Sequence, residues 1–159
     1  MHSLNTETKI IIVGGIITIL AVVGISLLLS SSSTSIPDDQ IVAKNGLHWH
    51  PRLEIYINTE KQEIPANIGI LPTKHEEIHT HDDASEGILH MEMNGLVTKD
   101  ETRIARFFQI WGKKFNSGQI FEFKNSSEAA VKMLVNGKEN KDFENYQMKD
   151  GDLIIIRYE

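Results

Sequence analysis

A long apolar run near the N-terminus is the first pattern along the chain. Residues 10–29 read IIIVGGIITILAVVGISLLL and contain no charged side chain. At about 1.5 Å per residue, a helix of this length spans roughly 30 Å, the thickness of the hydrocarbon core of a bilayer. The run predicts a transmembrane anchor at residues 10–29. A cleaved signal peptide is the competing interpretation, although its apolar core is usually only about 7–15 residues long.

The charges that flank the run favour a cytoplasmic N-terminus. Lys9 precedes it, partly offset by Glu7, whereas Asp38 and Asp39 follow it. Because positive charge tends to stay in the cytoplasm, residues 1–9 are expected there as a short N-terminus. The rest of the chain is then expected outside the cytoplasm, held to membrane lipid by a single-pass anchor.

A polar segment and one domain follow the anchor. Residues 30–44 contain a serine-rich stretch and then a proline with two aspartates. Such a composition stays solvated, so we expect a flexible linker at residues 30–44. The remaining chain of about 115 residues is enough for one hydrophobic core and too short for two. We therefore expect one soluble extracytoplasmic domain at residues 45–159.

Alternation of apolar and polar positions predicts short strands within this domain. The expected strands are 53–57, 62–66, 76–81, 88–93, 131–135 and 153–158. Turn sequences lie between them at 58–61, 82–87, 94–95 and 136–137. The segment Leu153–Ile156 is apolar on both faces, which suits a central strand.

One amphipathic helix is predicted among these strands. Apolar residues recur with helical spacing and form a single stripe; they are Ile104, Phe107, Phe108 and Trp111. Thr98 and Glu101 fit a capping box, and Gly112 fits the helix end. The expected fold class is α+β: one N-terminal transmembrane helix, then a mostly antiparallel β-sheet domain with one covering helix.

Composition excludes several functional classes. The chain has 16 basic and 22 acidic side chains, a net charge of -6, and no basic stripe, so no nucleic acid is expected as a partner. The absence of cysteine excludes a thiol nucleophile and a lipid-modified cysteine anchor. The chain also has no G-x-S-x-G motif and no glycine-rich phosphate loop, and no helix is predicted that carries an H-E-x-x-H sequence. The sequence therefore supports binding better than turnover.

Three short motifs carry the candidate chemistry. They are His48-Trp49-His50, His79-Thr80-His81-Asp82 and His90-Met91-Glu92. Residues i and i+2 of a strand project to one face, so each motif presents paired polar groups, and the alternate positions are mostly apolar. The candidate metal ligands are His48, His50, His79, His81 and His90, with Glu92 as the weaker candidate. Imidazole and carboxylate suit a divalent metal ion, copper or zinc.

Nearby residues are expected in supporting roles. His75 is expected in a loop rather than in the ligand set. Asp82 and Asp83 either orient an imidazole or simply form the turn that contains them. Met91 and Met93 alternate with the polar positions of their strand, so they are expected in the core rather than as copper(I) ligands.

Two resemblances extend this description. The histidine strands, together with 65–70 and 107–112, resemble an uncharacterised family of membrane-anchored extracytoplasmic histidine-rich proteins of bacteria and archaea. The likeness covers most of the chain after His48 and implies no activity, because that family is of unknown function. Segments 135–137 and 149–155 are similar to the tail of ubiquitin-like sulfur carriers. Those carriers end in Gly-Gly, whereas this chain ends in Tyr158-Glu159, so the likeness implies a β-grasp-like fold without the carrier chemistry.

Three functional hypotheses follow. The first is a metal-binding or metal-delivery protein outside the membrane. The second is a small histidine-ligated metalloenzyme, with an open coordination position at the floor of a pocket. The third is an accessory subunit or interaction module of a membrane protein complex, with an exposed apolar patch beside the histidines.

Overall fold

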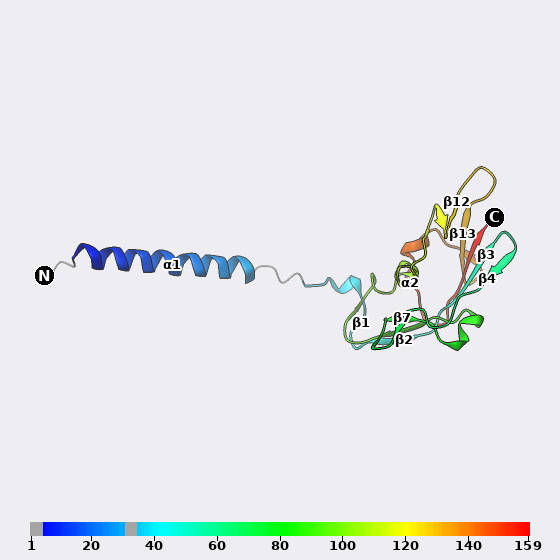
Figure 1. Ribbon diagram of the computed structural model, residues 1–159, viewed down its shortest axis with the longest axis horizontal. Helices are drawn as coiled ribbons and strands as arrows, with labels where there is room; N and C mark the ends of the chain where they lie inside the picture. Colours follow the sequence, from blue (N-terminus) through cyan, green and yellow to red (C-terminus); the bar gives the residue numbers. More distant parts are fainter. Residues whose placement is uncertain (1–4, 31–34) are drawn as a thin grey trace. The chain divides into compact units, whose positions relative to one another are not determined.

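The computed structural model describes residues 5–30 and 35–159 of the chain. Residues group into two units, Met1–Ile36 and Pro37–Glu159, and each is described by itself. The first unit contains helix α1, Thr6–Ser30 (Figure 1). The side chain of Asn5 caps this helix, since its Oδ1 accepts hydrogen bonds from the backbone N–H and hydroxyl of Thr8, at 2.9 and 2.7 Å.

Helix α1 includes the whole apolar run predicted from the sequence. The segment Thr6–Ser26 has a mean hydropathy of 2.4, and it is long and apolar enough to cross a membrane. The predicted helix at residues 10–29 is thus confirmed as a helix, with an earlier start at Thr6. A signal sequence near an N-terminus meets the same criteria of length and composition.

The domain begins earlier than the sequence suggested. Helix η1, Asp38–Gln40, and strand β1, Ile41–Ala43, both fall within the segment expected as a flexible linker. Strand β1 pairs antiparallel with β9, Val97–Thr98. The prediction of a flexible linker is therefore wrong from Pro37 onward. Strand β1 is too short to show an alternating pattern in the sequence, and it is ordered by its pairing with the distant strand β9. The linker residues 31–34 lie outside the described residues.

The largest sheet has five strands in the order β14-β13-β15-β3-β4. Their bounds are β3, Arg52–Ile57; β4, Glu60–Gln62; β13, Val131–Val135; β14, Lys138–Glu139; and β15, Leu153–Tyr158. The pair β15–β3 is parallel, and the other pairs are antiparallel. Strand β15 lies at the centre of the sheet, which confirms the prediction made from its two apolar faces.

The turn of the first hairpin is shorter than expected. Ile57 of β3 pairs with Glu60 of β4, so the connection consists of Asn58 and Thr59 alone. Asn58 has a φ of 57°, which asparagine tolerates and which two-residue hairpins require at this position. The predicted strand at 62–66 is consequently wrong, because the second strand occupies Glu60–Gln62.

A second sheet positions the histidines. It consists of β2, Leu47–Trp49; β8, His90–Met93; and β7, Ile78–His79, in the order β2-β8-β7 with antiparallel pairing. The chain passes from β2 through Pro51 directly into β3, so the two sheets share one continuous segment. The backbone oxygen of Pro51 accepts a hydrogen bond from the N–H of Leu89 at 2.9 Å, which extends the pairing across the junction.

Small elements complete the domain. They are β5, Ile70–Leu71; β6, Lys74–His75; β10, Phe115–Asn116; β11, Gln119–Ile120; β12, Phe123–Lys124; and the 3₁₀ helices η2, Asp82–Glu86, and η3, Phe143–Asn145. Strands β5 and β6 form a hairpin, and β10, β11 and β12 form a three-stranded sheet. Helix η2 occupies the turn predicted between the second and third histidine motifs.

Helix α2, Ile104–Trp111, has the bounds that its apolar stripe predicted. Gly112 ends it with a φ of 70°, and its N–H donates to the carbonyls of Phe108 and Gln109. The predicted capping box is wrong. Glu101 Oε2 does accept from the backbone N–H of Thr98 at 2.6 Å, but this contact closes a turn before the helix. The first helical N–H, that of Ile104, donates instead to the carbonyl of Tyr146 at 2.9 Å.

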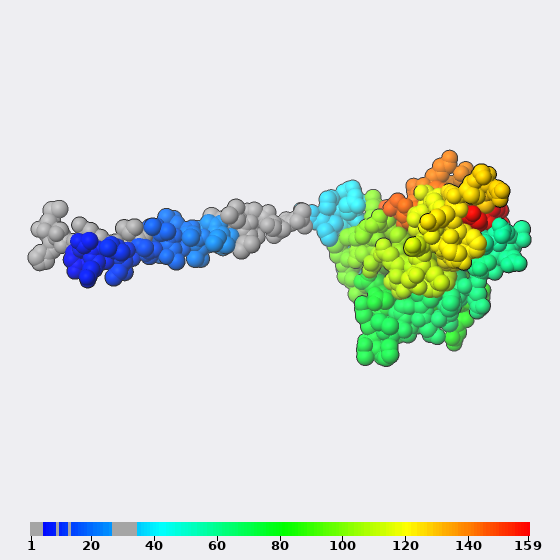
Figure 2. Space-filling model, turned by 45° about the horizontal axis from the view of Figure 1, so that its top comes forward, coloured from blue at the N-terminus to red at the C-terminus, as the bar shows by residue number. Residues whose placement is uncertain are grey.

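One core joins both sheets to α2. Buried residues of β3, β15, β8 and α2 belong to a single hydrophobic cluster; they include Leu53, Ile55, Met91, Met93, Ile104, Phe107, Phe108, Ile154 and Ile156. Figure 2 shows the unit of residues 37–159 as one continuous surface built from segments along its whole length. The expected α+β class with mostly antiparallel sheets is confirmed, with the β15–β3 pair as the parallel exception.

Candidate metal centre

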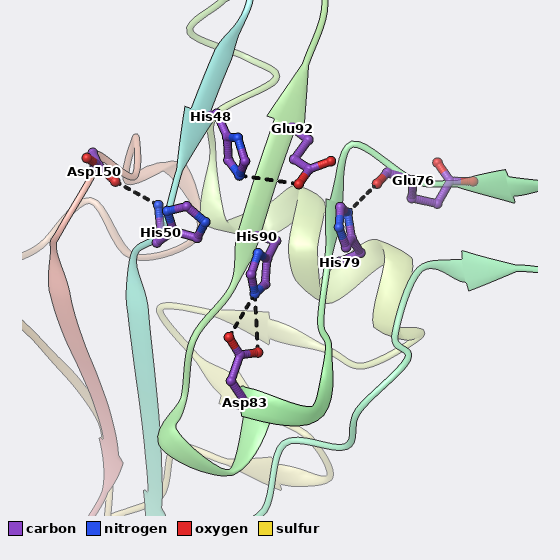
Figure 3. Close-up of polar contacts among 8 residues, drawn as sticks. All are labelled: His48, His50, Glu76, His79, Asp83, His90, Glu92 and Asp150. Carbon is purple, nitrogen blue, oxygen red and sulfur yellow. Dashed lines mark hydrogen bonds and ion pairs between the residues drawn. The ribbon is translucent and has the colours of Figure 1, made fainter.

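The pairing of β2 with β8 places His48 opposite Glu92. The two residues are register partners, and His48 Nε2 lies 3.3 Å from Glu92 Oε1 (Figure 3). Trp49 and Met91 pair on the other face of the same strands. The alternation predicted from the sequence therefore holds here, and the polar face carries both an imidazole and a carboxylate.

His50 lies just after β2, where the chain passes from one sheet to the other. Its backbone N–H donates to Asp150 Oδ1 at 2.7 Å, so the loop before β15 fixes the backbone at this position. The ring centroid of His50 lies 4.7 Å from that of His48 and 4.9 Å from that of His90. Figure 3 shows these three rings facing the same region between β2 and β8.

His90 is oriented by a carboxylate. His90 Nε2 lies 3.0 and 3.2 Å from the two oxygens of Asp83 in η2. Because an ionised carboxylate only accepts hydrogen bonds, Nε2 carries the proton in this contact, and Nδ1 keeps its lone pair. Asp83 thus lies in the predicted turn and also orients an imidazole, so both roles proposed for it from the sequence are combined.

His48, His50 and His90 form a candidate metal site. One ring nitrogen from each of them lies within 4.8 Å of the other two. Among the described residues, 5–30 and 35–159, no other group of three or more histidine, aspartate or glutamate side chains brings its ligand atoms this close together. His48 and His50 are exposed and His90 is half-buried, so the candidate site is open to solvent.

His79 lies on the same sheet but outside this group. It pairs with His90 across β7 and β8, and its side chain is fully buried, with 0% of its surface exposed. Its Nδ1–H donates to the backbone carbonyl of Glu76 at 2.8 Å. Burial lowers the pKa of this imidazole, which favours its neutral form. The other nitrogen, Nε2, is buried without a hydrogen-bond partner.

His81 and His75 extend the cluster. The ring centroid of His81 lies 4.7 Å from that of His90 and 4.9 Å from that of His79. The ring of His75 lies 5.4 Å from that of His79. The expectation that His75 is a loop residue is wrong, since it belongs to β6 and its hairpin folds it onto the other histidines. The Leu71-Pro72-Thr73-Lys74 sequence, a turn between two short strands, was the signal that could have revealed this.

The remaining sequence candidates lie where the alternation placed them. Glu92 is exposed beside His48, whereas Met91 and Met93 are buried in the core, 0% and 5% exposed. The thioethers of both methionines therefore lie on the opposite face of β8 from the imidazoles. Six histidines in total form one continuous set of neighbouring rings: His48, His50, His75, His79, His81 and His90.

A cavity of about 380 Å³ lies behind β2. Its lining consists of Val42, Trp49, Thr102, Gln147, Met148, Lys149 and Asp150. Trp49 occupies the face of β2 opposite His48, and none of the three clustered histidines lines this cavity. The cavity therefore does not lead to the candidate ligand nitrogens.

Comparisons with protein-family models, with curated proteins and with solved structures give no match for this chain. The functional inference therefore rests on the residues and their geometry.

Proposed function

We propose that this protein is a membrane-anchored, extracytoplasmic metal-binding protein that holds copper(II) or zinc at His48, His50 and His90. The observation that carries the proposal is the convergence of one nitrogen from each imidazole within 4.8 Å of the others. Neutral imidazole is a common ligand of both ions.

The distances between the three ring nitrogens suit an ion after small rotations of the side chains. Zinc–nitrogen bonds of about 2.0–2.1 Å in a tetrahedral site place ligand nitrogens roughly 3.3–3.4 Å apart. Two of the three side chains, His48 and His50, are exposed and able to rotate without disturbing the core. The strands meanwhile fix the Cα positions through the β2–β8 ladder.

Carboxylates outside the ligand set strengthen the proposal. Metal-bound histidines usually donate their second ring N–H to a carboxylate or carbonyl, which fixes the tautomer and raises ligand basicity. The Asp83–His90 pair at 3.0 Å supplies such a contact, and Glu92 lies 3.3 Å from His48. Glu92 either plays the same part for His48 or supplies a fourth ligand.

The exposure of the site favours exchange of the ion over a purely structural role. A structural zinc site is usually closed by four protein ligands. Here three imidazoles converge, and two of them are exposed to solvent. Such a site supports binding and delivery of an ion, and the cavity behind β2 offers no substrate pocket at the ligand nitrogens.

The proposed location rests on α1 and on its flanking charges. A helix of this length and hydropathy supports an anchor, and Lys9 before it favours a cytoplasmic N-terminus. An exposed site on a membrane-anchored protein also suits a membrane protein complex as the partner that receives the ion.

The strand order supports a β-grasp-like fold for the larger sheet. A hairpin, a helix, a second hairpin and a last strand follow one another along the chain as β3–β4, α2, β13–β14 and β15. The last strand lies at the centre, parallel to the first and flanked by both hairpins. In this proposal the β2-β8-β7 sheet and its histidines are an addition to that framework. The added sheet is formed by β2, which leads directly into β3, and by β7 and β8, which lie within residues 63–103.

Calorimetric titration of copper(II) and zinc into the full chain in detergent micelles tests the proposal. We expect binding tighter than about 10 μM, which corresponds to roughly 7 kcal/mol. The double variant His48→Asn/His50→Asn should lose one bound equivalent of metal. The control variant His2→Asn, which changes the histidine before the anchor, should bind as the parent does. Weaker binding by the parent, or an unchanged double variant, would overturn this function.

A further inference from the structure

The second half of the histidine cluster contains an imidazole nitrogen for which the fold provides no partner. His79 is 0% exposed, and its Nε2 makes no hydrogen bond. A polar group buried without a hydrogen-bond partner lowers stability, so proteins rarely keep one without a role. The position of this nitrogen among other imidazoles suggests what it binds.

The tautomer of His79 leaves that nitrogen as a lone pair. The carbonyl of Glu76 only accepts hydrogen bonds, so the contact at 2.8 Å places the proton on Nδ1. Nε2 of the neutral ring is then unprotonated, as a metal ligand must be. Metal-bound histidines usually donate their other ring N–H to a carboxylate or a backbone carbonyl, and the contact between His79 Nδ1–H and the Glu76 carbonyl is of this kind.

The backbone around His79 is held in place by its neighbour. Thr80 is fully buried, and its hydroxyl donates to the carbonyl of Pro65 at 2.8 Å and accepts from the N–H of Ile68 at 2.9 Å. The backbone N–H of Thr80 also donates to the carbonyl of Ile68 at 3.0 Å. The segment that contains both His79 and His81 is therefore fixed before any ion arrives.

Two further imidazoles flank the fixed ring. The ring centroids of His81 and His75 lie 4.9 and 5.4 Å from that of His79, and 6.2 Å from each other. His75 is exposed and His81 is half-buried, so both can turn toward the buried nitrogen. In this structure their nitrogens have not converged as closely as those of His48, His50 and His90.

We propose that His75, His79 and His81 form a second binding site for a divalent metal ion, with His79 Nε2 as its preformed ligand. The site takes copper(II) or zinc, and it deepens the proposed metal-binding function while using none of the residues of the first site. Ion binding draws His75 and His81 inward and satisfies the buried nitrogen.

His90, a ligand of the first site, lies next to the second. Its ring centroid is 4.9 Å from that of His50, 4.7 Å from that of His81 and 5.7 Å from that of His79. The exposed first site and the partly buried second site are therefore connected by one continuous path of imidazoles. An ion captured at His48 and His50 has a ligand available at each step toward His79.

The stoichiometry of zinc binding to the full chain in detergent micelles tests this inference. We expect the parent and the His2→Asn control to bind two equivalents. The His75→Asn/His81→Asn variant should bind one, and so should His48→Asn/His50→Asn. None of these variants changes the fully buried His79. Cadmium NMR with isotope-labelled histidine should show coupling of the bound ion to His79 Nε2 in the His48→Asn/His50→Asn variant.

The other outcomes separate the two proposals. One equivalent that survives in His75→Asn/His81→Asn and disappears in His48→Asn/His50→Asn overturns the second site and leaves the first. The reverse pattern overturns the first site and supports the second. A parent that binds a single equivalent, which both double variants lose, means one mixed site and overturns the inference, as does a parent that binds no zinc.

Discussion

Asp83 and His90 are joined across the turn between the second and third histidine motifs, with Asp83 Oδ2 3.0 Å from His90 Nε2. Helix η2 makes this contact possible, because it turns the chain back over β8 within residues 82–86. Gly87 ends η2 with a φ of 83°, and a Cβ atom there would lie 2.4 Å from the carbonyl oxygen of Leu53. The orientation of a candidate ligand thus depends on a tight turn that only glycine allows.

Removal of this carboxylate should weaken metal binding. The variant Asp83→Ala leaves His90 in place but deletes the acceptor that fixes its tautomer, and such changes typically lower metal affinity by about 10–100-fold. Calorimetric titration of zinc into the full chain measures the effect. The neighbouring exposed Asp82 provides the control, since Asp82→Ala should keep the affinity of the parent. Equal affinities in both variants would remove Asp83 from the metal centre.

Metal binding should stabilise the domain, and acid should abolish the effect. The proposed ligands lie on separate strands, so the unfolded chain does not bring them together, and binding favours the folded state by mass action. An ion at 100 times its dissociation constant should add about 2.7 kcal/mol to the free energy of unfolding. Because protons compete for the imidazole nitrogens, the gain should decrease as the pH falls. Thermal unfolding with zinc, and with zinc plus a chelator, measures it at each pH; identical curves would contradict the prediction.

The helix packing gives a stability prediction. Phe107 is 0% exposed, and its ring lies 5.8 Å from that of Phe108 and 5.6 Å from that of Trp111. Phe107→Ala should therefore lower the free energy of unfolding by about 3–5 kcal/mol, as large truncations in cores do. Gln109→Ala, on the exposed face of α2, should change it by less than about 0.5 kcal/mol. Urea unfolding measures both, and similar midpoints for the two variants would place Phe107 outside the core.

A hydrogen bond on the largest sheet predicts a pH-dependent stability. Tyr56 donates to Glu54 Oε2 at 2.9 Å, and this bond, followed by the nearby Lys61 ammonium, holds the pKa of Glu54 below its usual value. A lowered pKa means that the ionised carboxylate favours the folded state. The stabilisation is therefore fully present above the pKa of the unfolded chain and is lost as the pH falls through the lower folded value.

The variant Tyr56→Phe tests this relationship. It should raise the pKa of Glu54, and its stability should fall below that of the parent at neutral pH and approach it in acid. Tyr158→Phe is the matched control. The Tyr158 hydroxyl donates to the backbone carbonyl of Lys124, and a carbonyl oxygen does not titrate. NMR titration of Glu54 and urea unfolding across the acid range measure the two effects. A constant difference between parent and Tyr56→Phe at all pH values would exclude the mechanism.

The proposed anchor makes a simple prediction for the native protein. If α1 is retained, the intact mass should correspond to the full chain, and the protein should remain with the membrane after washing at high salt. If the run is a cleaved signal, the mature chain should begin near Ser33. That result would remove the proposed membrane anchor and leave the proposed metal site unaffected, since its candidate ligands all lie in the second unit.

The local sequence pattern was sufficient to predict the elements whose pattern is long or clearly bounded. Strands β13 and β15 and helix α2 have the bounds that alternation and helical spacing predicted, and α1 contains the whole apolar run. Side-chain alternation also placed Met91 and Met93 in the core, opposite His90 and Glu92. These features can be predicted from neighbouring residues, because an element that buries one face repeats its apolar residues with the period of a strand or a helix.

Pairing between distant segments decided the rest. Strand β1 is defined by its partner β9, and the first turn of α2 is completed by the carbonyl of Tyr146, so neither was visible in its own sequence. The sequence likewise identified five histidine ligand candidates in three motifs, but not their grouping. Only the fold places His48 and His50 beside His90, brings in His75 by a hairpin, and buries His79. The physical reason is that a metal site depends on distances between side chains on separate strands, and those distances follow from sheet order and register rather than from spacing along the chain.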